Sequence, residues 1–273
     1  MLRRAPNGAT RVAAVIGNPV RHSLSPALHN AAFEAAGLDW TYVALECADG
    51  RRAVEAMRTL GIGGMSVTMP HKQAVAASVD RRSAAVEALG AANCVRWDGD
   101  QLVGENTDGD GFVRSLVEIG LDMENRRCVI VGAGGAARSI LQALETVGAA
   151  DIAVVNRTES RAIEAAAIAP LCARVGSFDD IASADLVINS TPIGMGDDAG
   201  LSVPVDLIGP DHVVADLIYH PALTPLLAGA ASRGARTLNG LAMLVHQAAI
   251  QFEHWTGQPA SVEAMCAAVG LTD

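Results

Sequence analysis

Cys128-Val129-Ile130-Val131-Gly132-Ala133-Gly134-Gly135-Ala136-Ala137 is the stretch of the sequence that decides the fold. An apolar strand pattern passes through a glycine-rich turn into a helix, which is the context that the dinucleotide-binding fingerprint requires. Glycine permits a tight turn and close approach of a pyrophosphate, and the helix N-terminus offers unpaired N–H groups to the anion. We therefore expect Gly132, Gly134, Gly135 and Ala136 to hold a dinucleotide, the alternative being a plain strand-to-helix turn.

The end of the next strand indicates which dinucleotide binds. In NAD-binding proteins this position usually carries Asp or Glu, which accepts a hydrogen bond from the ribose 2′-hydroxyl. Here Asn156, Arg157 and Thr158 follow one another, and Arg161 lies one helical turn further on. A carboxylate would repel a 2′-phosphate, whereas arginine can form a forked hydrogen bond to it. These residues favour NADP, unless the arginines merely solvate the start of a helix.

Short apolar runs alternate with helical patterns on both sides of the glycine turn, which is typical of α/β folds with parallel strands. The runs lie at residues 12–16, 41–45, 62–67, 128–131, 152–156, 185–190, 213–219 and 236–239. A hairpin is expected at 93–104, because Asp98-Gly99 suits a tight turn. The fold class we predict is α/β with two domains. A doubly wound, Rossmann-type NADP-binding domain covers 108–240, and an α/β substrate-binding domain covers 1–107 plus the tail 241–273, in which a helical pattern runs from 241 to 256 and is ended by Gly257.

Composition excludes several classes of protein. The formal charge is −10 without a basic run, which argues against a nucleic-acid partner. The five cysteines are scattered without a CxxC pair, and the seven histidines lack metal-ligand spacing, so neither disulfides nor a metal site is expected. No run of eighteen apolar residues and no signal peptide are found, so we expect a cytoplasmic protein that does not enter membranes.

Three groups of polar residues in the first half are candidate site residues. Ser25 and Pro26 fit the start of a helix, with Ser25 as N-cap, but Ser23 and the preceding loop also suit a carboxylate ligand. Lys72 follows a buried strand, where ligands of α/β sheets bind, although a lone lysine there is more often a surface charge. Asp108 begins a helix and could serve only as its cap.

Over nearly its whole length the chain resembles shikimate dehydrogenases. The matching motifs are Gly17-Asn18-Pro19, His22-Ser23-Leu24-Ser25-Pro26, Val67-Thr68-Met69-Pro70-His71-Lys72, Gly90-Ala91-Ala92-Asn93, Asn106-Thr107-Asp108-Gly109, the turn from Gly132, Asn156-Arg157-Thr158, Asn189-Ser190-Thr191-Pro192, Asp216-Leu217-Ile218-Tyr219 and Asn239-Gly240-Leu241-Ala242-Met243-Leu244-Val245-His246-Gln247. The sequence departs from the family at Ser66, where many relatives have Asn, and the resemblance implies that a shorter hydroxyl here replaces an amide that contacts one ring hydroxyl of the substrate.

The resemblance implies the remaining assignments. Lys72 and Asp108 would be the catalytic pair that acts when 3-dehydroshikimate is reduced to shikimate with NADPH. Residues that would bind substrate are Ser23, Ser25, Ser66, Thr68, Asn93, Tyr219 and Gln247. Ile218, Gly240 and Met243 would lie at the nicotinamide. A monomer or homodimer is expected. The alternatives are a quinate/shikimate dehydrogenase, or a paralogue acting on a modified ring, and a non-catalytic nucleotide-sensing protein.

Overall fold

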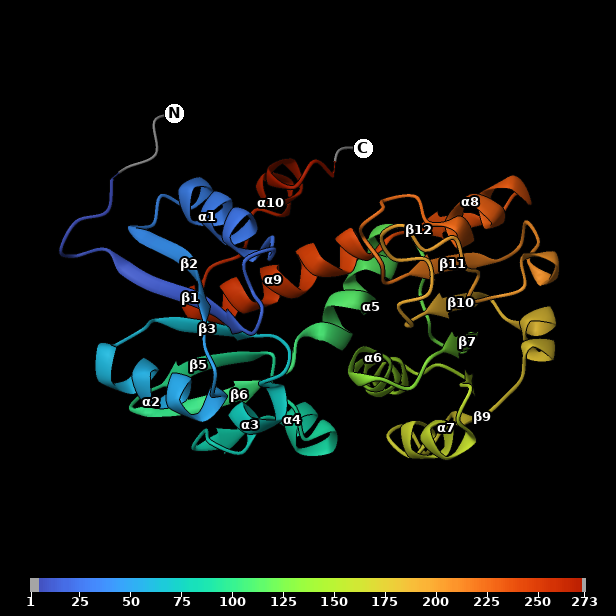
Figure 1. Ribbon diagram of the computed structural model, residues 1–273, viewed down its shortest axis with the longest axis horizontal. Coiled ribbons are helices and arrows are strands. Elements are labelled where there is room, and N and C mark those ends of the chain that lie inside the picture. Colours follow the sequence, from blue (N-terminus) through green and yellow to red (C-terminus); the bar gives the residue numbers. More distant parts are fainter. Residues whose placement is uncertain (1–4, 272–273) are drawn as a thin grey trace. The chain divides into compact units, whose positions relative to one another are not determined.

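The computed structural model describes residues 5–271, which form two compact units. The first unit contains the chain up to Thr107 and again from Val245, and the second unit runs from Asp108 to Leu244. Within the described residues each unit has its own six-stranded sheet (Figure 1). The sequence led us to expect the return to the first unit at residue 241. The division lies at Val245, inside the unbroken helix α9 (Gly240–Thr256).

The sheet of the first unit is mixed. Its strands are β1 (Arg11–Gly17), β2 (Trp40–Glu46), β3 (Gly64–Val67), β4 (Arg81–Arg82), β5 (Cys94–Asp98) and β6 (Gln101–Glu105), in the order β2-β1-β3-β5-β6-β4. β1 pairs in parallel with β2 and β3, whereas β5 is antiparallel to β3 and β6. Because β1 and β3 are parallel neighbours, the loops that follow them leave from the same edge of the sheet.

The expected hairpin is formed by β5 and β6, but its turn is displaced by one residue from the position expected. Asp98 still pairs with Gln101, so the two turn residues are Gly99 and Asp100. Gly99 has a φ of 64°, a left-handed conformation that glycine adopts without strain.

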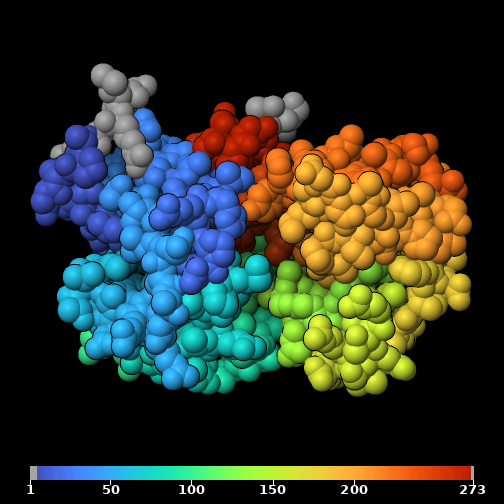
Figure 2. Space-filling view, in the orientation of Figure 1, coloured from blue at the N-terminus to red at the C-terminus, as the bar shows by residue number. Residues whose placement is uncertain are grey.

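Helices cover the first sheet on both sides and include the end of the chain. They are α1 (Ser25–Ala35), α2 (Gly50–Leu60), α3 (Lys72–Ala76), α4 (Ala84–Leu89), the second part of α9 and α10 (Val262–Ala268). The tail packs back as expected, since α10 contacts α1, and Figure 2 shows their surfaces side by side. The side chains of Phe252, Trp255 and Met265 are buried in this unit.

The second unit has a fully parallel sheet with the doubly wound connectivity that the sequence predicts. Its strands are β7 (Arg127–Val131), β8 (Asp151–Val155), β9 (Ala173–Val175), β10 (Leu186–Asn189), β11 (Val213–Asp216) and β12 (Arg236–Leu238), in the order β12-β11-β10-β7-β8-β9. The chain moves outward from β7 to β9 and then returns to β10 on the other side of β7. In sheets of this kind ligands bind at the carboxyl ends of the strands, at the reversal of strand order.

Helices pack on both faces of this sheet, and one pair approaches unusually closely. The helical elements are α5 (Asp108–Glu118), α6 (Gly135–Thr146), α7 (Glu159–Ala166), the 3₁₀ helices η1 (Phe178–Ser183) and η2 (Val205–Leu207), and α8 (Pro225–Ser232). A Cβ on Gly109 of α5 would overlap the main-chain carbonyl of Ser139 on α6. The crossing of α5 and α6 therefore requires glycine at position 109.

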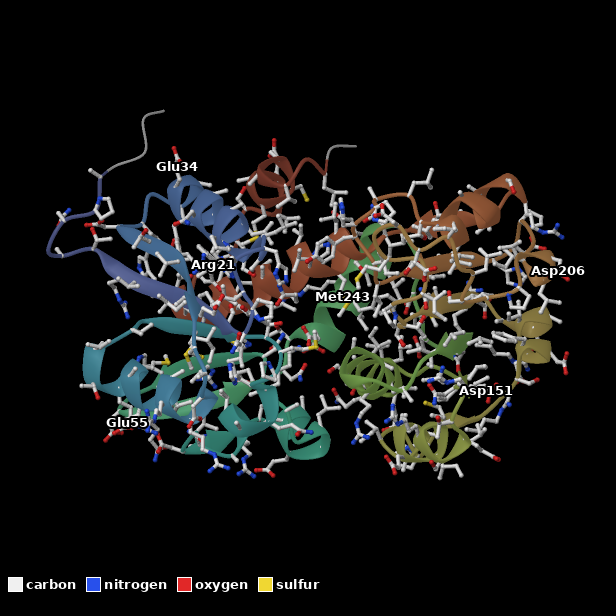
Figure 3. The ribbon with its side chains drawn as sticks, in the orientation of Figure 1. Arg21, Glu34, Glu55, Asp151, Asp206 and Met243 are labelled. Carbon is white, nitrogen blue, oxygen red and sulfur yellow. The ribbon has the colours of Figure 1, made fainter. Side chains whose placement is uncertain are left out.

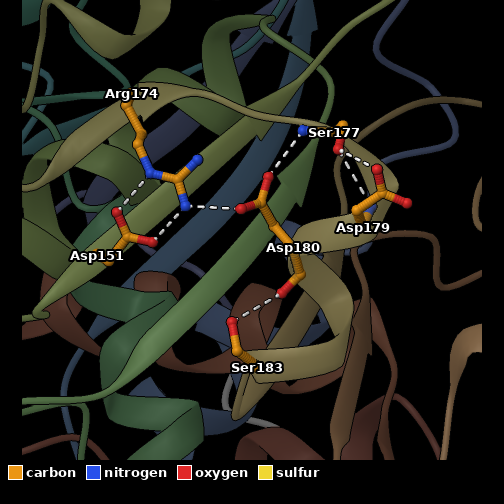
Figure 4. A network of polar contacts seen from close by, with 6 residues as sticks. All are labelled: Asp151, Arg174, Ser177, Asp179, Asp180 and Ser183. Carbon is orange, nitrogen blue, oxygen red and sulfur yellow. Dashed lines mark hydrogen bonds and ion pairs between the residues drawn. The ribbon is translucent and has the colours of Figure 1, made fainter.

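An exposed ion-pair network closes the β8-β9 edge. The guanidinium of Arg174 on β9 donates to Asp151 on β8 at 2.7 and 2.8 Å, and to Asp180 of η1 at 2.7 Å (Figure 4). Arg174 lowers the pKa of the Asp180 carboxyl, and the main-chain N–H of Ser177 adds to this effect. The arginine side chain is 47% exposed, so the network orders the edge and contributes little to overall stability.

Candidate functional site

The glycine turn has the geometry that a phosphate-binding turn needs. Gly132 has a φ of 111°, and a side chain there would collide with Ser190 at the end of β10. A Cβ on Gly134 or Gly135 would meet nothing within 4 Å, so the first turn of α6 is open to a ligand. No side chain caps α6 at Gly134, which leaves its first N–H groups for an anion. The structure thus brings Gly132, Gly134, Gly135 and Ala136 to the reversal point of the sheet.

The cationic residues lie one strand away, after β8. The Asn156 amide donates to the main-chain carbonyl of Thr158 at 2.9 Å and closes the loop that carries Arg157. Arg157 and Arg161 are both exposed, and neither forms an ion pair in the part of the chain that the structure describes. Their positive charge is therefore not neutralised by a neighbouring carboxylate, as a site for a 2′-phosphate requires.

Asp216, for which no role was predicted from the sequence, holds the loop after β11. Its buried carboxylate accepts hydrogen bonds from Thr224 at 2.7 Å, Asn189 at 2.9 Å and the Ile218 main-chain N–H at 3.1 Å. Burial raises the pKa of Asp216, and these three donors oppose the rise. Asp216 is a charged residue at the end of an otherwise apolar strand, and this pattern in the sequence could have marked it as a functional or structural residue.

Ile218 and Gly240 are brought together in the second unit. The Gly240 N–H donates to the Ile218 carbonyl at 3.1 Å, and a side chain on Gly240 would overlap the Leu217 carbonyl. Met243 follows on α9 and packs against the apolar core of this unit (Figure 3). Tyr219 is the next residue after Ile218 and is half-buried.

In the first unit, Ser23 and Ser25 lie within hydrogen-bond distance of each other. The Ser23 hydroxyl donates to that of Ser25 at 3.1 Å, and the Ser25 N–H donates to Ser23 at 3.2 Å. The prediction of Ser25 as N-cap is wrong. Leu24 occupies the cap position with helical backbone angles, so Ser25 is the first helical residue and its hydroxyl is not used for capping.

The loops after β1 and β3 are tied together at the same edge of the sheet. The Thr68 N–H donates to the Ile16 carbonyl at 2.9 Å, and the Asn18 N–H donates to the Met69 carbonyl at 3.0 Å. Gly17 is required at this contact, because a Cβ there would press on the Thr68 side chain. Thr68 and Lys72 therefore follow the strand next to the one that leads to Ser23 and Ser25.

Hydrogen bonds link the Lys72 segment to the residue before Asp108. The Lys72 carbonyl accepts from the Ala92 N–H at 3.0 Å, and the neighbouring Asn93 side chain accepts from the Thr107 N–H at 2.8 Å. Lys72 is the first residue of α3, and Asp108 is the first residue of α5. Both candidate catalytic residues therefore begin a helix, as the sequence predicted for Asp108.

Gln247 and Ser66 belong to a buried network that also contains two residues overlooked in the sequence, Tyr42 and Gln251. The Tyr42 hydroxyl donates to Ser66 at 2.6 Å, and Ser66 in turn donates to the Gln251 side-chain carbonyl. The Gln251 amide nitrogen donates to the Gln247 side-chain carbonyl at 2.8 Å. Burial raises the pKa of Tyr42, while hydrogen bonds with Ser66 and Ser25 oppose the rise.

Metal binding and membrane insertion are two other classes of function to which the described residues can be compared. Within residues 5–271 no group of His, Cys, Asp and Glu side chains is arranged to hold a metal ion. Of the helices described, none has both the length and the hydropathy needed to cross a membrane.

A doubly wound sheet with an open glycine turn, joined to a second α/β unit that carries hydroxyls, amides and an amine, defines a dinucleotide-binding α/β protein of two units. Its segments match three families, described as the shikimate dehydrogenase substrate-binding domain (residues 15–95), shikimate/quinate 5-dehydrogenase (115–193) and the shikimate 5′-dehydrogenase C-terminal domain (240–269). The chain belongs to the shikimate dehydrogenase family.

Individual relatives agree over almost the full length. A protein of Geobacter metallireducens named shikimate dehydrogenase (NADP(+)) is 42% identical, with 92% of each chain covered. The structure of shikimate 5-dehydrogenase from Listeria monocytogenes in complex with shikimate and NAD is 33% identical, with a TM-score of 0.92 over 97% of this chain and 98% of that one. Quinate dehydrogenase from Corynebacterium glutamicum in complex with NAD is 32% identical, with a TM-score of 0.89 over 96% and 99%.

Proposed function

We propose that this protein catalyses the reversible NADPH-dependent reduction of 3-dehydroshikimate to shikimate, a step of aromatic amino acid biosynthesis, with Lys72 and Asp108 as the residues that handle the proton. The family and the name of the Geobacter relative support the reaction and the cofactor. The protein is accordingly an NADP-dependent oxidoreductase. The open glycine turn and the two exposed arginines fit such a cofactor.

The observation that carries the residue assignment is the use of lysine. Lys72 is the only lysine in the 273 residues, and apart from the histidines every other basic side chain is arginine. Arginine supplies positive charge but does not release a proton at ordinary pH, whereas lysine does. A lysine at this one position, at the start of α3, therefore supports a role in proton transfer.

The proposed chemistry divides between cofactor and protein. Bound NADPH supplies the hydride for the ring ketone. The Lys72 ammonium donates a proton to the oxygen as it develops negative charge, and the Asp108 carboxylate accepts a hydrogen bond from that ammonium and orients it. In the opposite direction, the Lys72 amine takes the proton from the ring hydroxyl.

Hydroxyls and amides of the first unit would orient the ring. Ser23 and Ser25 would donate to the substrate carboxylate, because their oxygens lie 3.1 Å apart and follow one another at the start of α1. Ser66, Thr68, Asn93 and Gln247 would contact the ring hydroxyls, with Tyr219 beside them. Ile218, Gly240 and Met243 would lie at the nicotinamide, and Arg157 with Arg161 at the 2′-phosphate.

The likeness to a quinate dehydrogenase makes quinate a second candidate substrate. Quinate carries an extra hydroxyl on the carbon that bears the carboxylate, so it needs both space and a polar partner beside Ser23 and Ser25. We expect shikimate to be preferred. The test is kcat/KM for shikimate and for quinate, each with NADP and with NAD. Comparable values for the two acids would move the protein to the quinate/shikimate dehydrogenases, and lack of turnover with all four pairs would favour a nucleotide-sensing protein.

We further propose that the protein acts in the cytoplasm as a monomer or homodimer. Its five cysteines are free, as suits a reducing compartment. Light scattering of the purified chain would give the oligomeric state.

A further inference from the structure

A directional hydrogen-bond network in the first unit determines which end of the Gln247 side-chain amide contacts Gln251 and which end is turned away from it. We propose that Gln251 is a positioning residue that holds the Gln247 amide with its nitrogen outward, and that Tyr42, acting through Ser66, keeps Gln251 in place. The proposal rests on the proposed function, because it deepens the role of Gln247 toward the ring hydroxyls of the substrate.

Two main-chain groups fix the direction of the network. The Thr107 N–H, which can only donate, contacts the side-chain oxygen of Asn93 at 2.8 Å. The other end of the Asn93 amide is therefore the nitrogen, which donates to the Thr107 hydroxyl at 3.0 Å. The single hydrogen of that hydroxyl then goes to an acceptor, either the Gln247 main-chain carbonyl at 3.2 Å or the Asn93 side-chain oxygen at 3.3 Å, so the Thr107 oxygen can only accept from a further partner.

The orientation of the Gln251 amide follows from these assignments. One end of the amide faces the Thr107 hydroxyl oxygen at 3.2 Å and the Asn93 main-chain carbonyl at 3.4 Å. Both are acceptors here, so this end must be the nitrogen. The same nitrogen donates to the Gln247 side-chain carbonyl at 2.8 Å. The Gln251 oxygen then faces Ser66, which gives it the only hydroxyl hydrogen that Ser66 has.

The network therefore gives Gln247 and Ser66 opposite roles toward the substrate ring, with Gln247 as hydrogen-bond donor and Ser66 as acceptor. Since the Gln247 oxygen accepts from Gln251, its amide nitrogen points the other way, and Gln247 offers N–H donors to whatever it contacts. Ser66 accepts from Tyr42 and donates to Gln251, so only a lone pair of its oxygen remains for a ligand. A substrate that fits both residues must accept at Gln247 and donate at Ser66, and a hydroxyl-bearing ring can do both.

Burial makes this arrangement rigid. Gln251 is 1% exposed, and Tyr42 is 2% exposed. Rotation of the Gln251 amide by half a turn would bring its oxygen into contact with the carbonyl oxygens of Asn93 and Gln247. The free-energy cost of such a contact is much larger in the buried interior than in water. Gln251 thus acts on the substrate through Gln247, and Tyr42 acts through Ser66.

A double-mutant cycle on KM for shikimate tests the proposal. Gln251→Glu keeps the size of the side chain and an acceptor for Ser66 but removes the donor, so the Gln247 amide should turn over and present oxygen to the ring. We expect KM to rise roughly tenfold, while kcat changes less than roughly threefold. In a Gln247→Ala background the same change should raise KM less than roughly twofold, because Gln251 then has nothing to orient.

An equal rise of KM in both backgrounds would overturn the proposal, since Gln251 would then act independently of Gln247. If Gln251→Glu does not fold, Gln251→Met keeps the length without a charge. Gln251→Met should raise KM when Gln247 is present and raise it much less in the Gln247→Ala background. If the single variant Gln251→Met has the same KM as the unchanged enzyme, the proposal is also overturned.

The control is Trp97→Phe, which removes a 2.8 Å hydrogen bond from β5 to the Ile62 carbonyl, in the segment just before β3. This change should lower stability and leave KM unaltered. Wild-type turnover is measured first with shikimate and NADP. Its absence would contradict the proposed function, whereas an additive cycle in an active enzyme contradicts only the role of Gln251.

Discussion

The imidazole of His29 stacks on the phenol ring of Tyr42, with ring centroids 4.4 Å apart and planes inclined by 15°. His29 is fully buried, and neither of its ring nitrogens has a hydrogen-bond partner among the described residues. Burial lowers its pKa to about 3. The folded protein therefore holds this histidine neutral beside the network that contains Ser66.

Stability should fall below pH 6.5 because of His29. The unfolded chain takes up a proton near pH 6.5, whereas the folded chain does so only near pH 3, so acid favours the unfolded state between these values. The free energy of unfolding should drop by about 1.4 kcal/mol per pH unit in this range from this group alone. The free energy of unfolding, measured with urea between pH 5 and 8, should depend less on pH in His29→Phe than in the wild type. The control is His22→Gln, because His22 is exposed. A pH dependence in His29→Phe equal to that of the wild type would contradict the burial effect.

Replacement of Lys72 should strongly lower turnover without unfolding the protein. A positioned general acid contributes about 10² to 10⁴-fold, so Lys72→Ala should lower kcat by that factor. Lys72→Arg keeps the charge but cannot release a proton, and it should be nearly as slow. Melting temperatures should stay close to that of the wild type. A Lys72→Arg variant with near-wild-type kcat would show that only positive charge is needed.

The single lysine also permits a chemical test. Reductive methylation of the wild type labels only Lys72 and the N-terminal amine, because no other lysine is present. We expect shikimate together with NADP to protect Lys72 from labelling. Mass spectrometry of the digested protein reads the modified peptide directly, and equal labelling with and without ligands would place Lys72 outside the site.

Arg157 should determine the choice of cofactor. A charged hydrogen bond to phosphate contributes about 1.5 to 3 kcal/mol, so Arg157→Ala should weaken NADP binding about ten- to a hundredfold. NAD binding should barely change, since NAD lacks the phosphate. Arg161→Ala is the matched comparison, and we expect it to have a smaller effect. Titration calorimetry with both cofactors measures this, and equal loss of NAD and NADP affinity would exclude a phosphate contact.

The crossing of α5 and α6 should not tolerate a methyl group at position 109. In Gly109→Ala the new Cβ would overlap the Ser139 carbonyl, which is main chain and cannot move aside alone. We expect the variant to lose at least about 2 kcal/mol of unfolding free energy. Gly8→Ala is the control, because a Cβ there meets nothing within 4 Å. Urea midpoints that agree between the two variants would contradict the tight crossing.

The sequence was most informative where local chemistry determines the structure. The α/β class, the doubly wound sheet and the glycine turn could be predicted, because apolar runs and glycines carry a direct local signal. Ser25 as N-cap was wrong, since the backbone of Leu24 already lies in the helical region. α10 was not predicted, although Ser261 caps it by accepting from the Ala264 N–H, a signal that is visible in the sequence.

Structural features that depend on contacts between residues far apart in the chain could not be predicted from local sequence patterns. β4 consists of two exposed arginines without an apolar pattern, so nothing in its composition marks a strand. Gln247 and Gln251 are four residues apart and share a face of α9, but the side-chain oxygen of Gln251 accepts from Ser66, 185 residues away in the chain. Only the tertiary fold brings the two together, and the sequence alone gives no reason to pair them.

The first unit is completed by the last part of the chain, and this affects the order in which the protein can be made. Trp255 lies against Gly64, where no side chain would fit, and donates to the Val95 carbonyl at 3.1 Å. The first unit therefore cannot close its core until the segment that carries Trp255 has been synthesised, which follows synthesis of the whole second unit. The second unit is continuous in sequence, so all of its residues are available for folding before the first unit is complete.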